Sequence, residues 1–318
     1  MAGLEAGHYT DLQNATGCTV FLCREGAVGG VDVRGGSPGT RETDLLRPVH
    51  RVDQVHAVVL SGGSAFGLDA ASGVVSYLES QGIGFRVGSK DDPVRVPIVS
   101  SAILYDLGLI SSRFRPGAEE GRSACFAASS LPMPEGSVGA GTGATVAKLG
   151  GAGRGVKGGI GSASIVLSTG QTVAAAVAVN ALGGIWDYTD GKLIAGPRRA
   201  DGGVDDPVSM LLEYNAEPPS GPVNTTIGLV ATDARITKED ANYLARVSHD
   251  GLALTIRPCH TIRDGDTMFA MATGYNGSRL DLTSLGAAAV EVTGQAVLRA
   301  VRQATGIGGI PAINELEI

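Results

Sequence analysis

The chain has 318 residues, of which 43% are hydrophobic and 18% are charged, and its formal net charge is −7. This composition is typical of a globular protein with a large core, and the acidic balance argues against nucleic-acid binding, which needs a basic surface. No segment approaches the roughly 18 consecutive apolar residues of a membrane span, so a membrane partner is not expected.

The start of the chain and its cysteines indicate the cellular compartment. Residues 1–10 contain Glu5 and His8 and have no basic patch followed by an apolar run. The sequence therefore predicts no signal peptide and a cytoplasmic location. The four cysteines form no C-x-x-C pair and are interpreted as ordinary buried thiols. Length alone leaves both one large domain and two ordinary domains open.

The first third of the chain predicts two strands and a helix. Short apolar or alternating runs predict strands at residues 19–23 and 57–60. Small and apolar residues recur at three- and four-residue steps over residues 65–78, which predicts a helix. Residues 96–107 are apolar with a mixed period, so strand and helix both stay open there.

The middle of the chain predicts a hairpin followed by a long connection. Residues 162–168 and 172–179 are β-rich runs around a Thr-Gly-Gln turn, which predicts an antiparallel hairpin. Residues 196–223 are rich in Arg, Asp, Gly and Pro and predict an exposed, flexible connection with a short helix at residues 208–214. The strand predicted at residues 226–232 follows this loop at once, which suggests that a new chain begins there.

The last part of the chain predicts two helices and a strand. One helix is capped by Thr237 and runs to about residue 249, a strand spans residues 267–272, and a long amphipathic helix follows Asp281 over residues 282–304. The order of helices and mostly antiparallel strands predicts an α+β layered sandwich.

Three familiar motifs fail on their context. Residues 153–158 match G-x-G-x-x-G but lead into a strand-like segment, whereas a dinucleotide site needs a helix N-terminus. Ser64 precedes a helix, yet Phe66 occupies the last glycine position of a G-x-S-x-G nucleophile elbow. Ser64 is therefore interpreted as a helix cap or pocket lining. The histidines show no H-x-H or H-E-x-x-H spacing, so structural or surface roles are expected and no metal site.

One junction carries a specific resemblance. Residues 222–227 (Pro-Val-Asn-Thr-Thr-Ile) and 230–234 (Val-Ala-Thr-Asp-Ala) resemble the autoprocessing site of the DmpA-type peptidase family. Further similar blocks follow the same order along the chain, at residues 7–10, 16–20, 60–67 and 264–267. The family includes aminopeptidases, β-peptidyl aminopeptidases and nylon-oligomer hydrolases, and the Asn-Thr junction is similar to the nylon-oligomer hydrolase form.

The resemblance implies a precursor that cuts itself between Asn224 and Thr225. The expected products are a large subunit of residues 1–224 and a small subunit of residues 225–318, which together form one folded domain. The implied fold is an αββα layered sandwich, split autoproteolytically. The resemblance also implies a homo-oligomer of cleaved subunit pairs, expected to be a tetramer, and no metal or organic cofactor.

Thr225 is expected to be the nucleophile. Once freed, its own α-amine, with a reference pKa of about 7.7–8.0, can accept the hydroxyl proton directly or through water. Before the cut that nitrogen is an amide, so the precursor is expected to be inactive towards other substrates. Taken alone, Asn-Thr-Thr also fits a turn leading into a strand.

The resemblance implies five further site residues, each with a plainer structural interpretation. Asn180 matches an oxyanion asparagine, or is a hairpin-terminal residue. Lys148 matches a site lysine that holds the α-amine neutral by charge repulsion, or is solvated. Tyr105 matches a tyrosine that donates to the tetrahedral intermediate, or is a packed aromatic. Asp264 and Asp266 match a carboxylate pair beside the nucleophile, or belong to a turn.

The expected reaction is amide hydrolysis through an acyl-enzyme on Thr225, with 6-aminohexanoate oligomers as substrates. The first alternative is an aminopeptidase, D-amidase or esterase acting on small peptides, amides or esters. Two others are an enzyme of the ornithine acetyltransferase type, which also cleaves before Thr, and a non-catalytic protein that binds a small ligand in its Gly-rich loops.

Overall fold

The computed structural model describes residues 1–90, 93–213, 224–277 and 281–316. The longer strands are β1 (Glu5–Asp11), β2 (Thr16–Val33), β4 (Gln54–Ser61), β5 (Phe85–Gly88), β6 (Pro93–Val96), β7 (Val99–Ile103), β10 (Gly159–Val166), β11 (Thr172–Asn180), β12 (Gly184–Asp187), β13 (Lys192–Ala195), β14 (Thr225–Thr232) and β16 (Thr267–Ala272). The two-residue strands are β3 (Thr40–Arg41), β8 (Thr145–Val146), β9 (Val156–Lys157) and β15 (Ile256–Arg257). The α-helices are α1 (Ala70–Ser80), α2 (Ala118–Phe126), α3 (Pro207–Glu213), α4 (Lys238–Thr255) and α5 (Leu282–Arg302).

One large mixed sheet runs in the order β10-β11-β14-β16-β2-β4-β7-β3, with β1 added along β2. The pairs β14–β16 and β4–β7 are parallel, and the other neighbours are antiparallel. The long strand β2 joins the two halves, because its first part pairs with β4 and its last part pairs with β16, with an irregularity between Leu22 and Ala27. A local irregularity of this kind bends a strand and lets one sheet turn back on itself.

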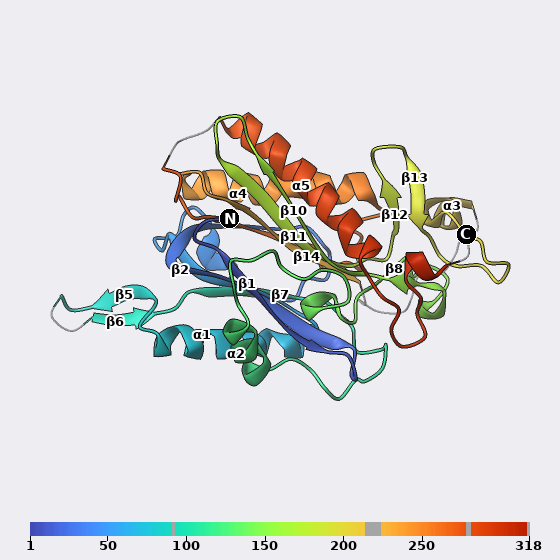
Figure 1. The fold of residues 1–318 in the computed structure, drawn as a ribbon, viewed down its shortest axis with the longest axis horizontal. Coiled ribbons are helices and arrows are strands. Elements are labelled where there is room, and N and C mark those ends of the chain that lie inside the picture. The colour runs from blue at the N-terminus through green and yellow to red at the C-terminus, as the bar shows by residue number, and fades with distance from the viewer. Residues whose placement is uncertain (91–92, 214–223, 278–280, 317–318) are drawn as a thin grey trace.

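The hydrophobic core divides into layers that follow these two halves. One cluster fills the space between α4, α5 and the outer face of β10, β11, β14 and β16. A second cluster lies between the inner faces of the two halves and includes Phe21, Leu60, Leu229 and Phe269. A third lies between β2, β4 and the helices α1 and α2. Figure 1 shows α4 and α5 on one side of the strands and α1 and α2 on the other, so the predicted αββα sandwich is confirmed.

Most predicted elements lie where the sequence pattern placed them. The strand β16 coincides with the predicted residues 267–272, and β10 and β11 form the predicted antiparallel hairpin. The helix α5 begins behind Asp281, whose side chain accepts a hydrogen bond from the main chain of Ser284. Among the described residues, no helix is long and apolar enough to cross a bilayer. Three of the four cysteines are buried and Cys259 is half-buried.

Four segments differ from the prediction. The strand expected at residues 19–23 is only part of the 18-residue β2. The helix expected at residues 65–78 starts as a 3₁₀ helix, η2 (Ser64–Asp69), and becomes α-helical at Ala70. The undecided residues 96–107 contain β7. In the predicted flexible connection, the expected short helix is present as α3, whereas residues 196–206 are folded back by a β-bridge between Arg198 and Val204, and the Pro-rich end lies outside the described residues.

Candidate active site

Three strand ends bring the predicted site residues together. Asn180 is the last residue of β11, and its register partner across the sheet is Thr225, the first residue of β14. The parallel pairing of β14 with β16 continues beyond the strands themselves as a bridge between Asn224 and Asp264. Asp266 directly precedes β16. The carboxyl end of β11 therefore meets the amino ends of β14 and β16 at the predicted junction.

The peptide between Asn224 and Thr225 is buried and held by hydrogen bonds. Thr225 is 4% exposed and Asn224 is 1% exposed. The Thr225 hydroxyl donates to the carbonyl oxygen of Asn224, and the main-chain N–H of Gly265 donates to the same oxygen at 3.1 Å. Within the described part of the chain, neither polar atom of the Asn224 side chain has a hydrogen-bond partner. The nucleophile predicted from the sequence thus lies against the carbonyl that it would attack.

Lys148 and Asn180 form one buried unit on the β11 side of the junction. Lys148 Nζ donates to the main-chain oxygen of Asn180 at 3.1 Å and to its Oδ1 at 3.0 Å. The same Oδ1 accepts from the main-chain N–H of Thr145 at 3.0 Å. Burial lowers the pKa of Lys148 to about 7, and the negative charge of Asp264 opposes this shift. The alternative of a solvated lysine is therefore wrong.

Tyr105 contacts this unit through its main chain. Its carbonyl oxygen accepts from Asn180 Nδ2 at 3.0 Å. The tyrosine lies two residues after the end of β7, in the half of the sheet opposite β11. Asn180 therefore joins the two halves of the sandwich at the site.

The two carboxylates on the β16 side have different surroundings. Asp264 Oδ2 accepts from the main-chain N–H of Thr261 at 2.8 Å and from its hydroxyl at 2.5 Å. Burial and the charge of Asp266 raise the pKa of Asp264 to about 6, although Thr261 and Lys148 act in the opposite direction. Asp266 Oδ1 instead accepts from the main-chain N–H of Thr226 at 2.6 Å, which fixes the residue after the predicted nucleophile.

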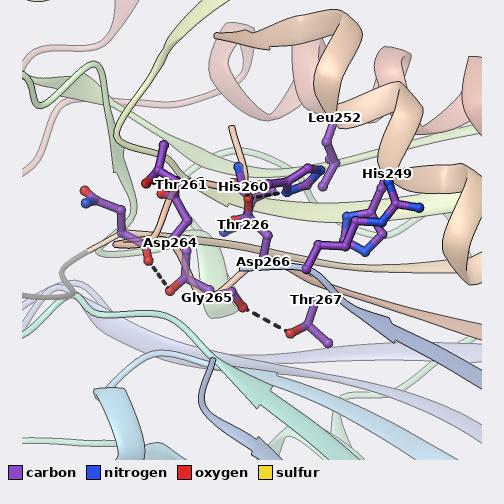
Figure 2. A network of polar contacts seen from close by, with 12 residues as sticks. Thr226, His249, Leu252, His260, Thr261, Asp264, Gly265, Asp266 and Thr267 are labelled. Atoms are coloured by element: carbon purple, nitrogen blue, oxygen red, sulfur yellow. Dashed lines mark hydrogen bonds and ion pairs between the residues drawn. The ribbon is translucent and has the colours of Figure 1, made fainter. Parts of the chain in front are cut away.

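His260 is a member of the site that the spacing of the histidines did not predict. Its Nδ1 lies 2.7 Å from Asp266 Oδ2, and its main-chain N–H donates to the same oxygen at 3.0 Å. Burial acts to lower the pKa of His260, but the bonds and charges of Asp266 and Cys259 raise it to about 10. Figure 2 shows His260 and Asp266 side by side, with His249 next to them.

His260 and Asp266 therefore form an ion pair in which Asp266 is buried and His260 is half-buried. The ring of His249 lies edge-on to that of His260, with 4.7 Å between the ring centroids. Burial lowers the pKa of His249 to about 4, so this neighbour is neutral. The only signal in the sequence was a histidine six residues before an aspartate in a predicted turn, which does not reveal a contact formed by the fold.

A buried lysine supports the segment that leads to Thr145 and Lys148. Lys157 Nζ donates to three carbonyl oxygens, those of Gly141 at 3.0 Å, Ala144 at 2.7 Å and Gly158 at 2.9 Å. Only an ammonium group has three N–H donors, so this geometry fits the charged form. Lys157 belongs to the segment that matches G-x-G-x-x-G; this segment contains the short strand β9 and leads into the strand β10, as predicted.

Replacing Lys157 with methionine is expected to lower the free energy of unfolding by about 3–5 kcal/mol, because three buried carbonyls lose their donor together. Urea unfolding of the Thr225→Ala chain, which is expected to stay in one piece, measures the change. The matched control is Lys192→Met, because Lys192 has 77% of its side chain exposed. The control should keep the parent midpoint, and equal midpoints for both variants would contradict the structural role of Lys157.

Comparisons with known proteins find relatives along nearly the whole chain. The model of peptidase family S58 matches residues 1–313. An uncharacterized aminopeptidase of Mycobacterium leprae is 39% identical, over 98% of this chain and 91% of that protein. A 6-aminohexanoate-oligomer endohydrolase of Agromyces sp. is 33% identical, over 93% of this chain and 82% of that protein.

Solved structures show the same fold at lower identity. A Burkholderia sp. β-aminopeptidase has a TM-score of 0.69 and 22% identity, covering 98% of this chain and 88% of its own. The L-aminopeptidase D-Ala-esterase/amidase of Ochrobactrum anthropi, described as a variant of the Ntn hydrolase fold, has a TM-score of 0.70 and 19% identity, covering 99% and 88%. With the family match over nearly the whole chain and relatives at 33–39% identity, these findings show that the protein belongs to peptidase family S58.

Proposed function

We propose that the chain cleaves its own peptide bond between Asn224 and Thr225 and then uses Thr225 as an N-terminal nucleophile. The observation that carries this proposal is the position of the Thr225 hydroxyl against the Asn224 carbonyl, at the point where Lys148, Asn180 and Asp264 converge. The expected pieces, residues 1–224 and 225–318, stay together, because β14 pairs with β11 of the large piece and β16 pairs with β2.

The proposed self-cleavage moves one acyl group from nitrogen to oxygen. The Thr225 oxygen bonds to the carbonyl carbon of Asn224, the hydroxyl proton passes to the Thr225 nitrogen, and the C–N bond breaks to give an ester. Water then hydrolyses the ester and leaves a carboxylate on Asn224 and a free amine on Thr225. The amine next to the hydroxyl serves as the base in later turnovers, in which the substrate acyl group is carried on Thr225.

The surrounding charges suit these steps. Lys148 lies on the β11 side of the junction, where its positive charge disfavours protonation of the freed α-amine and keeps it a base. Asp264 compensates the charge of Lys148 from the β16 side. Its charge acts to raise the pKa of Lys148, and the charge of Lys148 acts to lower the pKa of Asp264. Asn180 has the side-chain N–H donors for the oxyanion of the substrate reaction, and Tyr105 borders it.

Intact mass spectrometry of the purified protein tests the proposal directly. The uncut chain has a mass of 32.2 kDa, and a cut after Asn224 gives fragments of about 23 and about 10 kDa. Both fragments should appear and co-purify in native conditions. A single full-length species that persists on incubation would be evidence against self-cleavage.

We place oligoamides of 6-aminohexanoate first among the substrates. The Asn-Thr junction and the Asp264–Asp266 pair resemble the nylon-oligomer branch, and endohydrolases of that name are 33% identical to this chain. Aminopeptidase activity on small peptides is the second candidate, since several relatives at 39% identity carry that name. Parallel assays with a linear aminohexanoate oligomer and with aminoacyl p-nitroanilides separate the two, because the proposed substrate should be turned over with the higher kcat/KM.

His260 provides a test of how the new N-terminus is positioned. Its backbone has φ 55°, a left-handed conformation that Gly and Asn tolerate. His260→Gly should therefore keep the backbone and its N–H bond to Asp266 but remove the side-chain partner of Asp266, and it should lower the rate of self-cleavage by about 10-fold or more through lost positioning. His260→Asn keeps a side-chain donor near Asp266 and should recover most of that rate.

The readout is the rate constant for fragment formation after synthesis in a cell-free system. If His260→Gly cleaves as fast as the parent chain, the ion pair with Asp266 does not position Thr226. If His260→Asn and His260→Gly are slowed to the same extent, a donor at this position is not what matters.

A further inference from the structure

We infer that the main-chain N–H of Gly265 is the oxyanion donor of the self-cleavage step. The inference rests on the proposed function and adds a group that contacts the reacting carbonyl. When the Thr225 oxygen bonds to the carbonyl carbon, the electron pair of the C=O bond moves onto the Asn224 oxygen. A hydrogen bond already placed on that oxygen strengthens as the negative charge develops, and it needs no rearrangement at the moment of reaction.

In the uncut chain, the Gly265 N–H already donates a hydrogen bond to the carbonyl oxygen of Asn224. Its nitrogen is 3.1 Å from the Asn224 oxygen, and the bond belongs to the parallel bridge between Asn224 and Asp264. This bridge extends the ladder between β14 and β16, which starts with the pair Ile227 and Thr267. The donor is thus fixed by sheet pairing and not by a mobile side chain.

Neighbouring hydrogen bonds fix the peptide unit that carries this donor. The Asp264 carbonyl, in the same peptide plane as the Gly265 N–H, accepts from the main-chain N–H of Ser37 at 2.8 Å. On the other side, the Gly265 carbonyl accepts from the Thr267 hydroxyl at 3.0 Å, a contact visible in Figure 2. Both flanking carbonyls are held, so the N–H direction is set by the fold.

Glycine is required for this approach. A β-carbon at position 265 would lie 2.8 Å from the Ser37 carbonyl oxygen and 2.8 Å from Thr225 Oγ1. Any other residue would push the loop away from the junction or displace the nucleophile. The close approach of this main chain to Asn224 and Thr225 therefore depends on the missing side chain.

Asn180, the residue expected to supply an oxyanion donor, makes other contacts in the uncut chain. Asn180 Nδ2 donates to the Tyr105 carbonyl, and Asn180 Oδ1 accepts from Lys148. The described contacts thus place the Gly265 N–H on the scissile carbonyl and connect Asn180 to Tyr105 and Lys148. The structure assigns Gly265 to the self-cleavage oxyanion, and the proposed role of Asn180 belongs to the later substrate reaction.

An amide-to-ester replacement at position 265 tests the donor without adding a side chain. Glycolic acid, incorporated by a suppressor tRNA during cell-free synthesis, replaces the Gly265 N–H with an oxygen. The rate constant for fragment formation should fall about 10²–10³-fold, the usual loss for one oxyanion donor. The matched control is glycolic acid at Gly36, whose N–H donates to the Thr261 carbonyl at 3.2 Å and not to Asn224.

The Gly36 ester should cleave within a few-fold of the parent chain. Cleavage of the Gly265 ester at the parent rate, or equal slowing of both esters, would overturn the inference but leave the proposed function standing. A parent chain that never cleaves would instead remove the proposed function itself. If the Gly265 ester does not fold, NMR coupling across the hydrogen bond from Gly265 N to the Asn224 carbonyl carbon decides the matter in the Thr225→Ala chain. Observed coupling supports the inference, and its absence overturns it.

Discussion

Replacing Thr225 with alanine is expected to leave a single chain of 32.2 kDa with no hydrolase activity. The substitution removes the hydroxyl that lies against the Asn224 carbonyl, so no ester forms. Because the peptide bond stays intact, the nitrogen at position 225 remains an amide and cannot accept a proton. One substitution should thus abolish both self-cleavage and turnover, which intact mass spectrometry and an amidase assay measure on the same sample.

Thr225→Ser is the matched control for this experiment. Serine keeps the hydroxyl, so both fragments and activity should persist, although the loss of the methyl group leaves the hydroxyl less restricted. Two results would contradict the mechanism: fragments of about 23 and about 10 kDa from the alanine variant, or hydrolase activity in a preparation that is shown to be uncut.

The second large effect is expected from Lys148→Met, which keeps much of the side-chain volume but removes the charge. Lys148 is buried, its ammonium bridges two oxygens of Asn180, and its charge acts on Asp264. Losing it removes one of the contacts that hold the Asn180 side chain and leaves the charge of Asp264 uncompensated. Self-cleavage and turnover should each fall about 10²–10³-fold, comparable to the loss of one fixed electrostatic contact in an active site.

The pH dependence distinguishes this role from a structural one. With pKa values of about 6 for Asp264 and about 7 for Lys148, the carboxylate is ionised above pH 6 and the ammonium is charged below pH 7. Both charges coexist between these values, so the rate of self-cleavage should peak there. In Lys148→Met the fall in rate above pH 7, which is the upper limb of the pH profile, should disappear. The lower limb should move to higher pH, because a positive charge no longer favours the Asp264 carboxylate.

The exposed Lys192 again provides a control, since Lys192→Met should keep both the rate and the profile of the parent. A Lys148→Met enzyme with an unchanged upper limb would show that another group sets that limb.

Helices and strands could be predicted from the sequence where their signals, the spacing of apolar residues and the capping residues, lie within the element itself. The strand β16 and the helix α5 were predicted because a short apolar run and a capping aspartate are local features. The length of β2 could not be predicted, because the strand is extended by pairing with β4 and β16, which are distant in sequence. The 3₁₀ start of the first helix follows from positive φ values at Gly63 and Ser64, a backbone feature that periodicity does not report.

The site residues also fall into two groups, those that the sequence predicted and those that only the folded structure reveals. Residues that resemble family blocks, such as Lys148 and Asp264, were found from the sequence and are brought together by the fold. Gly265 and His260 were missed as site residues. The chemistry of Gly265 lies in its main chain, and the partner of His260 is defined only after the loop folds back on Asp266. Composition and spacing cannot reveal either contact.

The side-chain amide of Asn224, which has no hydrogen-bond partner among the described residues, gives the proposed cut a direction. In the continuous chain both polar atoms of this side chain are buried, and none of the described residues hydrogen-bonds to them. Each such atom destabilises a structure by about 1–3 kcal/mol compared with a hydrated one. Once the bond is broken, Asn224 is a chain end that can turn into water, so religation would require dehydrating it again. The proposed cleavage is therefore expected to favour the two-piece protein over religation.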